Sequence, residues 1–491
     1  MKEILSKNIF NLFKYSFIIL FFGIFTFTAI NYKANLYLYI LYSAITLFTI
    51  FYSHKKKIKF TNLFIFFFLF FGFWAKYSLN YIFDFNLIHR IGSFDTKNLN
   101  DLDNIVKFCS LITIFFFIPN IINYNLFIKF KNAEEYISVF YYKNEQKIFI
   151  IILTTILFMT STNYIFKFYQ KGLIPHEKKL LYYFFNFYYN FLILSILSYL
   201  AFFQLRIGKI RNSLLVIIDL FLTSVTILSR WLILIYYVFF LGVLKSFKKL
   251  FLNKKFFLLS FIVIFLIILS NILVHKGRET RFNNVYIDFK NNNFSNSKSE
   301  IENTIKKKYK TRSQKYETRS QSELSLIIKD ILFNRFLGVD GVMALYSSKD
   351  KSFEIFFNSF KKNEIFKFKN FYDSNYLLIN SNDNIFFKTN NLISQNSPGI
   401  VAFLMYSGSI YFVLTMIFLI TALTLLIEKI LNDIFKNKIF VSLIIFSIIY
   451  RLFHFGYAPG NSYKYLSALF ISISLPIIFN FILKIYYKKY L

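Results

Sequence analysis

The chain lacks the residues and patterns on which several common enzyme classes depend. Its 491 residues include a single cysteine, Cys109. One cysteine excludes an internal disulfide and a cysteine-based metal site. The sequence contains no HExxH, no Walker A and no GxSxG pattern, which argues against a zinc protease, an ATP-driven pump subunit and an α/β-hydrolase. We therefore expect neither a metal nor a cofactor.

Glycine, proline and charged residues are also scarce. With 13 Gly and 5 Pro, the chain gives little support to a transporter built on helices that break at mid-membrane. Charged residues make up 17%, whereas a soluble protein carries about 25%. Hydrophobic residues reach 56%. This composition predicts an all-α polytopic membrane protein.

The charge that is present is mostly positive. There are 58 Lys and Arg against 25 Asp and Glu, which gives a formal net charge of +33. A basic chain suggests nucleic acid as a partner. Here, however, the basic residues lie in short clusters between apolar runs, which is typical of membrane orientation. We therefore expect membrane lipid as a partner, and no nucleic acid.

Apolar runs long enough to cross a bilayer recur along the chain. A spanning helix needs about 20 mostly apolar residues, and about twelve candidates meet this requirement. The first is interpreted as a retained span, because no small-residue cleavage site follows it. The candidates are 15–31, 36–53, 60–80, 105–122, 147–165, 183–204, 212–229, 230–244, 256–274, 400–427, 439–455 and 464–484.

Every second connection between these spans is basic, and segment 166–182 is the exception. Basic loops stay in the cytoplasm. This alternation predicts that both termini are cytoplasmic and that the long polar segment lies outside, which for a bacterial chain means periplasmic or extracellular. The expected organisation is an N-terminal bundle (1–275), one large outer loop (276–398) and C-terminal spans (399–491).

The outer loop is not uniform. Residues 290–320 are polar and predicted to be flexible. Apolar residues at helical spacing follow, and Gly338 and Gly341 indicate a helix stop or turn there. The segment FEIFFNSF at 353–360 is suited either to lying on a membrane surface or to packing on the spans. The second half of the loop is thus expected to cap the outer mouth of the bundle.

Two groups of cations at the outer side are candidates for function. Arg230 stands alone between two apolar runs, and it either serves function or snorkels at a hairpin tip. His275, Arg278 and Arg281 lie where the ninth span leaves the membrane. The two arginines either grip a pyrophosphate through bidentate hydrogen bonds or form a solvated boundary charge run.

Further candidates lie in the loop and near the eleventh span. Arg335, followed by Asp340, either binds substrate or stabilises a helix C-terminus. Arg451 and His454 lie near the outer end of the span 439–455, where His454 is either a proton carrier or a structural histidine. The DxD at Asp101 and Asp103 is interpreted as helix capping in preference to metal binding.

The arrangement resembles the bacterial O-antigen polymerases and the related O-antigen ligases, which have ten to fourteen spans and one large periplasmic loop. The features that carry the resemblance are TILSRWLILIYY around Arg230, the large outer loop, and NSPGIVAFLMYSGSIYFVL at 396–414 with Gly399 and Gly408. FYQKGLIP at 168–175 and NRFLGVDGVMALYSS at 334–348 also look like this group. These motifs are specific only in combination.

The resemblance implies a glycosyltransferase in the bacterial inner membrane. It would join oligosaccharide repeat units carried on undecaprenyl pyrophosphate into a surface polysaccharide, by metal-independent inverting transfer. By the resemblance, Arg230, Arg278 and Arg281 hold the pyrophosphate and stabilise the leaving group. Substrate contacts are expected from His275, Arg335, Asp340, Arg451 and His454. A chain-length regulator is a candidate partner.

Other readings stay open. Ligases and many polymerases carry a His just before the span that follows the loop, and this chain has Ser394, Gln395, Asn396 and Ser397 there. The departure weakens the ligase alternative and leaves the general base unassigned among Asp340, His275 and His454. A mannosyltransferase-type enzyme is disfavoured because the first outer loop, NYKAN, has no acid. A flippase or a scaffold protein without enzymatic activity remains an alternative.

Overall fold

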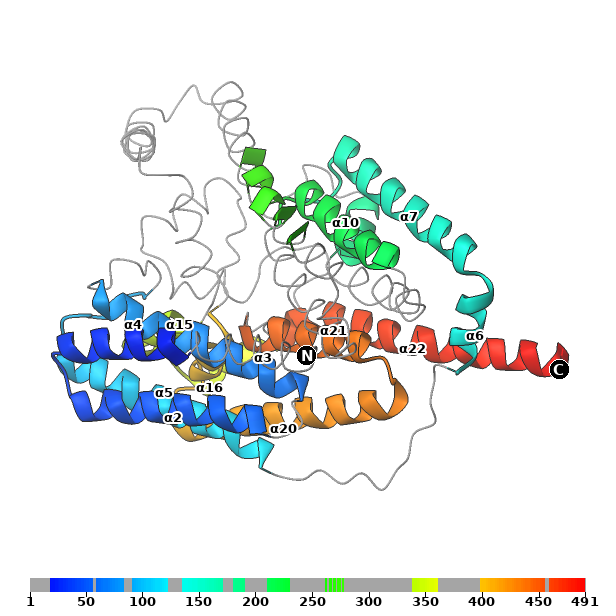
Figure 1. The fold of residues 1–491 in the computed structure, drawn as a ribbon. Coiled ribbons are helices and arrows are strands. Elements are labelled where there is room, and N and C mark those ends of the chain that lie inside the picture. The colour runs from blue at the N-terminus through cyan, green and yellow to red at the C-terminus, as the bar shows by residue number, and fades with distance from the viewer. Residues whose placement is uncertain are drawn as a thin grey trace, which may run out of the picture.

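The computed structural model describes the chain in ten stretches. They are residues 18–55, 59–83, 91–121, 135–170, 180–189, 210–229, 261–277 in part, 338–360, 398–454 and 459–490. Every regular element in these stretches is a helix (Figure 1). Arg230, His275, Arg278, Arg281 and Arg335, together with the predicted flexible stretch 290–320, lie outside the described residues.

Five described helices are long and apolar enough to cross a membrane. They are Phe60–Ile82, Leu99–Asn120, Glu145–Phe166, Ile410–Ile434 and Tyr465–Tyr487. Shorter apolar helices cover Ile18–Asn31, Leu36–Thr49 and Ile217–Thr226. The described part of the chain is thus that of a helical membrane protein. The predicted count of about twelve spans and the sidedness of the loop remain predictions.

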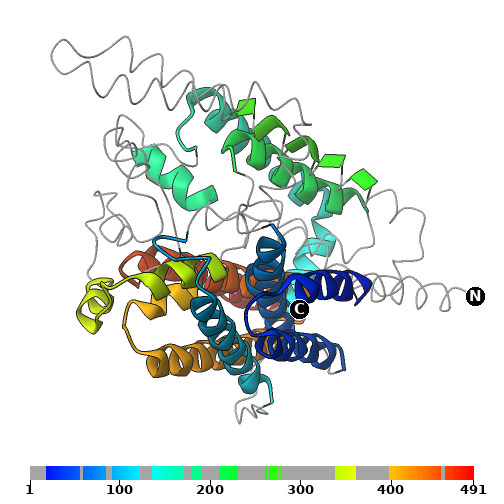
Figure 2. The ribbon, with the colours of Figure 1, turned by 90° about the vertical axis from the view of Figure 1, so that its left-hand side faces the viewer.

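The described helices form a main bundle and a second group. The bundle is built from the helix Ile18–Asn31, α2 (Leu36–Lys55), the helix α3–η1–α4 (Phe60–Ile82), α5 (Leu99–Phe117), α20 (Ile410–Ile434) and α21 (Lys438–Ile448). Within it α5 packs against both α2 and α20, and α21 packs against α3 (Figures 1 and 2).

The second group is linked to the C-terminal helix through one short helix. It contains α7 (Glu145–Phe166), α8 (Leu180–Phe187) and α10 (Ile210–Thr226), with α10 packed against α7. The short helix α6 (Glu135–Lys143) packs against α22 (Pro459–Tyr490). There Asn480 accepts hydrogen bonds from the backbone N–H groups of Tyr136 and Ile137, at 3.0 and 3.2 Å.

The span predicted at 400–427 is not one continuous helix. The apolar run 400–427 is divided into α19 (Ile400–Met405) and α20, with a turn between them. Gly408 in that turn has a φ of +76°, which an L side chain rarely adopts, and Ser409 caps α20 by accepting from Phe412 N–H at 3.3 Å. Hydrophobicity alone did not reveal the break, although both glycines of the 396–414 motif lie at helix starts.

Two helices in the bundle contain a π-helical segment. The first, η1 (Phe70–Trp74), interrupts the helix that begins at Phe60, and the second, η5 (Ile449–His454), continues α21. π-Helical turns occur often at functional sites. Lys76 follows the first segment and Arg451 lies within the second, and both side chains are buried. The π-helical segments therefore coincide with buried cations of the bundle.

A buried carboxylate joins two helices at the end of the bundle where α20 finishes. Glu428 accepts hydrogen bonds from the backbone N–H groups of Phe60 and Thr61, at 2.7 and 2.8 Å. These N–H groups lie at the start of α3, where a helix has unsatisfied donors and a positive dipole end. Glu428 therefore connects the last turns of α20 to the first turn of α3.

Candidate functional site

A short helix from the predicted outer loop is inserted into the bundle. Helix α15 (Val339–Ser347) packs against α19 and also contacts α5. Its residues from Val339 to Leu345 are all buried. This part of the predicted loop is therefore a core element rather than a surface cap.

Glycines permit this close packing. The sequence indicated Gly338 and Gly341 as a helix stop or turn. That prediction is wrong for Gly341, which lies inside α15, whereas Gly338 is the N-cap of α15 and the residues before it lie outside the described residues. A Cβ atom on Gly338 would overlap the carbonyl group of Gly72 in η1, and one on Gly341 would overlap the carbonyl oxygen of Pro398. Both positions need glycine because another backbone passes too close for a side chain.

A buried ion pair fixes the start of α15. Asp340 Oδ2 lies 2.8 Å from Lys76 Nζ on α4 (Ala75–Ile82), and the two side chains are only 7% and 3% exposed. The other carboxylate oxygen, Oδ1, accepts a hydrogen bond from Gly338 N–H at 3.0 Å. Both oxygens of Asp340 are thus engaged. This arrangement suits a residue that positions α15 better than one that accepts a proton from substrate.

The far end of α15 is held by a second set of contacts. Asn104 Nδ2 on α5 donates to the Tyr346 hydroxyl at 3.0 Å, and Ser93 donates to Ser347 at 3.2 Å. The Phe94 ring also meets the Tyr346 ring, with 6.2 Å between centroids. Helix α15 is therefore fixed at both ends, and Tyr346 is held against α5.

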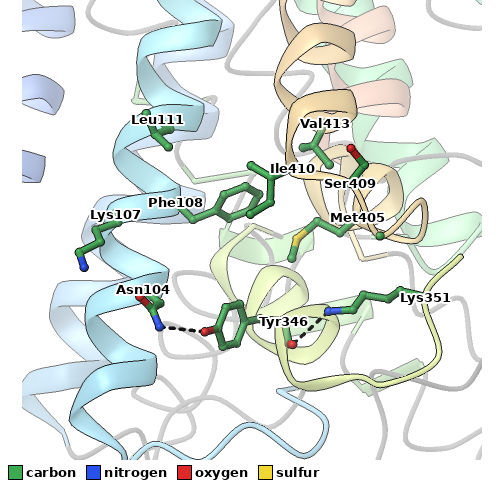
Figure 3. A pocket seen from close by; sticks show the side chains of 11 residues that line it. Asn104, Lys107, Phe108, Leu111, Tyr346, Lys351, Met405, Ser409, Ile410 and Val413 are labelled. Carbon is green, nitrogen blue, oxygen red and sulfur yellow. Dashed lines mark hydrogen bonds between the residues drawn. The ribbon is translucent and has the colours of Figure 1, made fainter.

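A pocket of about 470 Å³ lies between α5, the end of α15 and the start of α20 (Figure 3). Its polar lining comprises Asn104, Lys107, Tyr346, Lys351 and Ser409. Its apolar lining comprises Phe108, Leu111, Met405, Ile410 and Val413. No Asp or Glu is among the described side chains that line it. The pocket therefore combines a basic side with an apolar side.

The two lysines differ in their surroundings. Lys351 is half-buried, and its Nζ donates to the backbone oxygen of Tyr346 at 3.2 Å. Burial lowers the pKa of Lys351. Lys107 is exposed at the α5 side of the pocket and extends outward in Figure 3. Its flexible four-carbon chain allows the amine to turn toward a bound anion.

Two hydroxyl groups add neutral donors to this lining. The Tyr346 oxygen accepts from Asn104, which leaves its own hydrogen available to a ligand. Ser409 Oγ accepts from the Phe412 N–H, so that its hydrogen is likewise available. Lysine ammonium groups and hydroxyl donors are the groups that bind phosphate oxygens. The pocket is chemically suited to an anionic group attached to an apolar chain.

Among the site residues predicted from the sequence, the structure locates three. Asp340 is paired with Lys76, and Arg451 is buried in η5. For His454 only the backbone, at the end of η5, is described. Both α15 and η5 pack against α19, so Asp340 and Arg451 belong to elements that share a neighbour.

Sequence reasoning did not find Lys76, Lys107 or Lys351. A signal existed for the first two, because each is a lysine within a run predicted to span the membrane, where an ionisable residue is costly and usually functional. Lys351 carried no such signal, because it precedes FEIFFNSF among other polar residues. The prediction that the DxD caps the span after it is wrong, because Asn98 is the N-cap of α5. Asp101 lies in the first turn of that helix, and Asp103 accepts from Asn35 N–H at 3.0 Å.

Comparison with known proteins adds no assignment: no family model, no curated protein and no solved structure matches this chain.

Proposed function

We propose that this chain is a membrane-embedded polymerase of surface polysaccharide. In this proposal it joins oligosaccharide repeat units carried on undecaprenyl pyrophosphate, on the periplasmic side of a bacterial inner membrane. The observation that supports it best is the pocket between α5, α15 and α20. Lys107 and Lys351 offer positive charge on one side, and Phe108, Leu111 and Ile410 offer an apolar wall on the other.

This lining matches the two halves of a lipid-linked donor. A pyrophosphate needs cations and hydrogen-bond donors, which Lys351, Lys107 and the Tyr346 hydroxyl supply. The isoprenoid chain needs an apolar path, which the side chains from α5 and α20 supply. Without carboxylates in the described lining, no like charge opposes the phosphates.

The proposed reaction is a displacement at the anomeric carbon. A hydroxyl group of the acceptor sugar attacks from the face opposite the pyrophosphate, and a new C–O bond forms while the bond to the phosphate oxygen breaks. The pyrophosphate leaves with the electron pair, and the acceptor proton passes to a base. The lysines stabilise the negative charge that grows on the leaving group. Asp340 acts as a positioning residue through Lys76 and α15.

The basic groups predicted from the sequence complement the pocket in this proposal. Arg230, Arg278 and Arg281 remain candidate pyrophosphate ligands, and His275, Arg335, Arg451 and His454 remain candidate substrate contacts. A flippase or a ligase shares the need to bind a lipid-linked pyrophosphate, so the product must decide between them.

The test is the length of the surface glycan in a strain that carries only a variant chain. Lys107→Met, Lys351→Met, Arg230→Ala and Arg278→Ala should each stop the glycan at one repeat while the protein remains in the membrane. The matched control is Lys349→Met, because Lys349 is exposed and does not line the pocket. Wild-type lengths in both lysine variants would overturn the pocket assignment. Loss of all repeat-bearing material in a deletion strain would favour a flippase.

A further inference from the structure

A short aromatic helix beside the pocket exposes three phenylalanine rings. Helix α16 (Phe353–Asn358) begins two residues after Lys351 and is capped by Ser352, which accepts from Ile355 N–H at 3.2 Å. Phe353, Phe357 and Phe360 are 43%, 60% and 52% exposed. The ring centroids of Phe353 and Phe357 lie 6.2 Å apart, and those of Phe357 and Phe360 lie 6.1 Å apart. The three rings therefore form one continuous patch.

One face of α16 is attached firmly to the bundle. Phe356 is buried, and its ring meets Phe403 of α19 at 5.3 Å and Phe412 of α20 at 5.1 Å. Phe353 also touches Phe412, with 5.3 Å between centroids. The position of α16 relative to the first turn of α20 is therefore set by packing.

The exposed surface of α16 is itself divided into a polar and an apolar face. Phe353 and Phe357 are four residues apart and lie on one stripe of the helix, whereas Glu354 and Asn358, both exposed, lie on another stripe about 100° away. A helix at a bilayer surface has this pattern, with aromatic residues toward lipid and charged residues toward water.

The aromatic patch continues into a surface that faces lipid if α20 spans the membrane. Ile410 and Tyr411, in the first turn of α20, are 56% and 85% exposed, and exposed leucines follow further along the helix at Leu419 and Leu423. Ile410 also lines the pocket, as does Leu111 of α5, which is exposed as well. The apolar rim of the pocket is thus part of the same outer surface as the α16 patch.

We propose that α16 lies in the interface of one bilayer leaflet with Phe353, Phe357 and Phe360 among the lipid chains, and that the pocket opens sideways to that leaflet between Leu111 and Ile410. The occupant of the aromatic patch is bilayer lipid. Because Lys351 lies two residues before this helix, its amine would stand at the level of lipid phosphates. This inference depends on the chain lying in a membrane and not on the proposed reaction.

The experiment measures the depth of nitroxide labels on the protein in phospholipid vesicles. The only native cysteine, Cys109, is buried, so an introduced exposed cysteine is labelled selectively. Labels go on Phe357→Cys and Phe360→Cys in the patch, on Glu354→Cys on the polar face, and on Leu423→Cys as the reference within the span. Collision with oxygen reports lipid exposure, and collision with a water-soluble nickel chelate reports water exposure.

The labels at 357 and 360 are expected to collide several-fold more with oxygen than with the nickel chelate. Their ratio of oxygen to nickel collisions should lie between the ratio at 354, on the polar face, and the ratio at 423, within the span. Shielding of both labels from both reagents would mean that protein covers the patch. Water-like values at both would place α16 outside the bilayer. Either of these outcomes overturns the proposal.

The sideways opening is tested by a photoreactive benzophenone residue at position 410, which should form phospholipid adducts. The same residue at position 349 is the control and should form none. Equal adducts at the two positions, or no adducts at 410, would contradict the sideways opening.

Discussion

Asp340 on α15 and Lys76 on α4 form an ion pair with 2.8 Å between Oδ2 and Nζ, and both side chains are buried. The pair connects a helix of the N-terminal half to a segment that the sequence placed in an outer loop. Because Tyr346 lies on the same nine-residue helix as Asp340, the pair also determines where one wall of the pocket stands.

Breaking this pair from one side should be costly. Lys76→Met leaves a buried carboxylate without its cation, and Asp340→Leu leaves a buried ammonium without its anion. Each loss is expected to lower the free energy of unfolding by about 3–5 kcal/mol, whereas the double variant should recover most of it because neither charge of the pair remains buried. Thermal unfolding in detergent, followed by tryptophan fluorescence, measures all four proteins. Additive losses in the double variant would show that the two residues are not coupled.

The close approach of α15 to η1 predicts intolerance of a single methyl group. Gly338→Ala places a Cβ on the carbonyl group of Gly72, so α15 must shift, with an expected loss of about 1–3 kcal/mol. The control is Gly23→Ala in the helix Ile18–Asn31, where a Cβ meets nothing within 4 Å. The melting temperature should fall only for the first variant. Equal melting temperatures would contradict the packing described for Gly338.

The contact between Glu428 and the start of α3 gives a third stability prediction. Glu428→Gln keeps one oxygen but turns an amide N–H₂ toward a backbone donor, so one of the two hydrogen bonds is lost and the charge that favours the helix N-terminus is removed. The expected loss is about 1–3 kcal/mol. Asp433→Asn, at an exposed position of the same helix, is the control and should leave the melting temperature unchanged. A similar change in both variants would remove the special role given to Glu428.

Anion binding in the pocket should depend on pH through Lys351. Burial lowers the pKa of this lysine, so its ammonium form begins to disappear at a lower pH than that of an ordinary lysine. Affinity for inorganic pyrophosphate should be highest below the lowered pKa and should decline as the pH rises through it. Lys351→Arg keeps its charge throughout, since the guanidinium pKa exceeds about 12. Calorimetric titrations at pH values rising toward the ordinary lysine pKa should therefore show a decline that begins earlier in the wild type than in the variant. Parallel declines in both proteins would assign the dependence to another group.

The helices were largely predictable from the sequence, and the site was not. Apolar runs predicted the positions of α2, α5, α7 and α22. A segment in lipid must satisfy its backbone polar groups within a helix, so a long run of apolar residues is enough to identify it. The pocket depends on contacts between α5, α15 and α20, which lie far apart in the sequence and show no local pattern. The lysine at 76 was detectable as a charge inside an apolar run, but its pairing with Asp340 was not, since nothing in the sequence indicated that α15 enters the bundle.

The most direct test of the account uses purified protein in lipid nanodiscs with undecaprenyl-pyrophosphate-linked repeat units as the only added substrate. Mass spectrometry of the extracted lipids should detect products with two and more repeats, and free undecaprenyl pyrophosphate should appear in step with each new linkage. The Lys107→Met/Lys351→Met variant should form these products at under about a tenth of the wild-type rate, which corresponds to at least about 1.4 kcal/mol of lost transition-state stabilisation. Lys349→Met should match the wild type. No multi-repeat product from the wild-type protein, or equal rates in the double variant, would contradict the account.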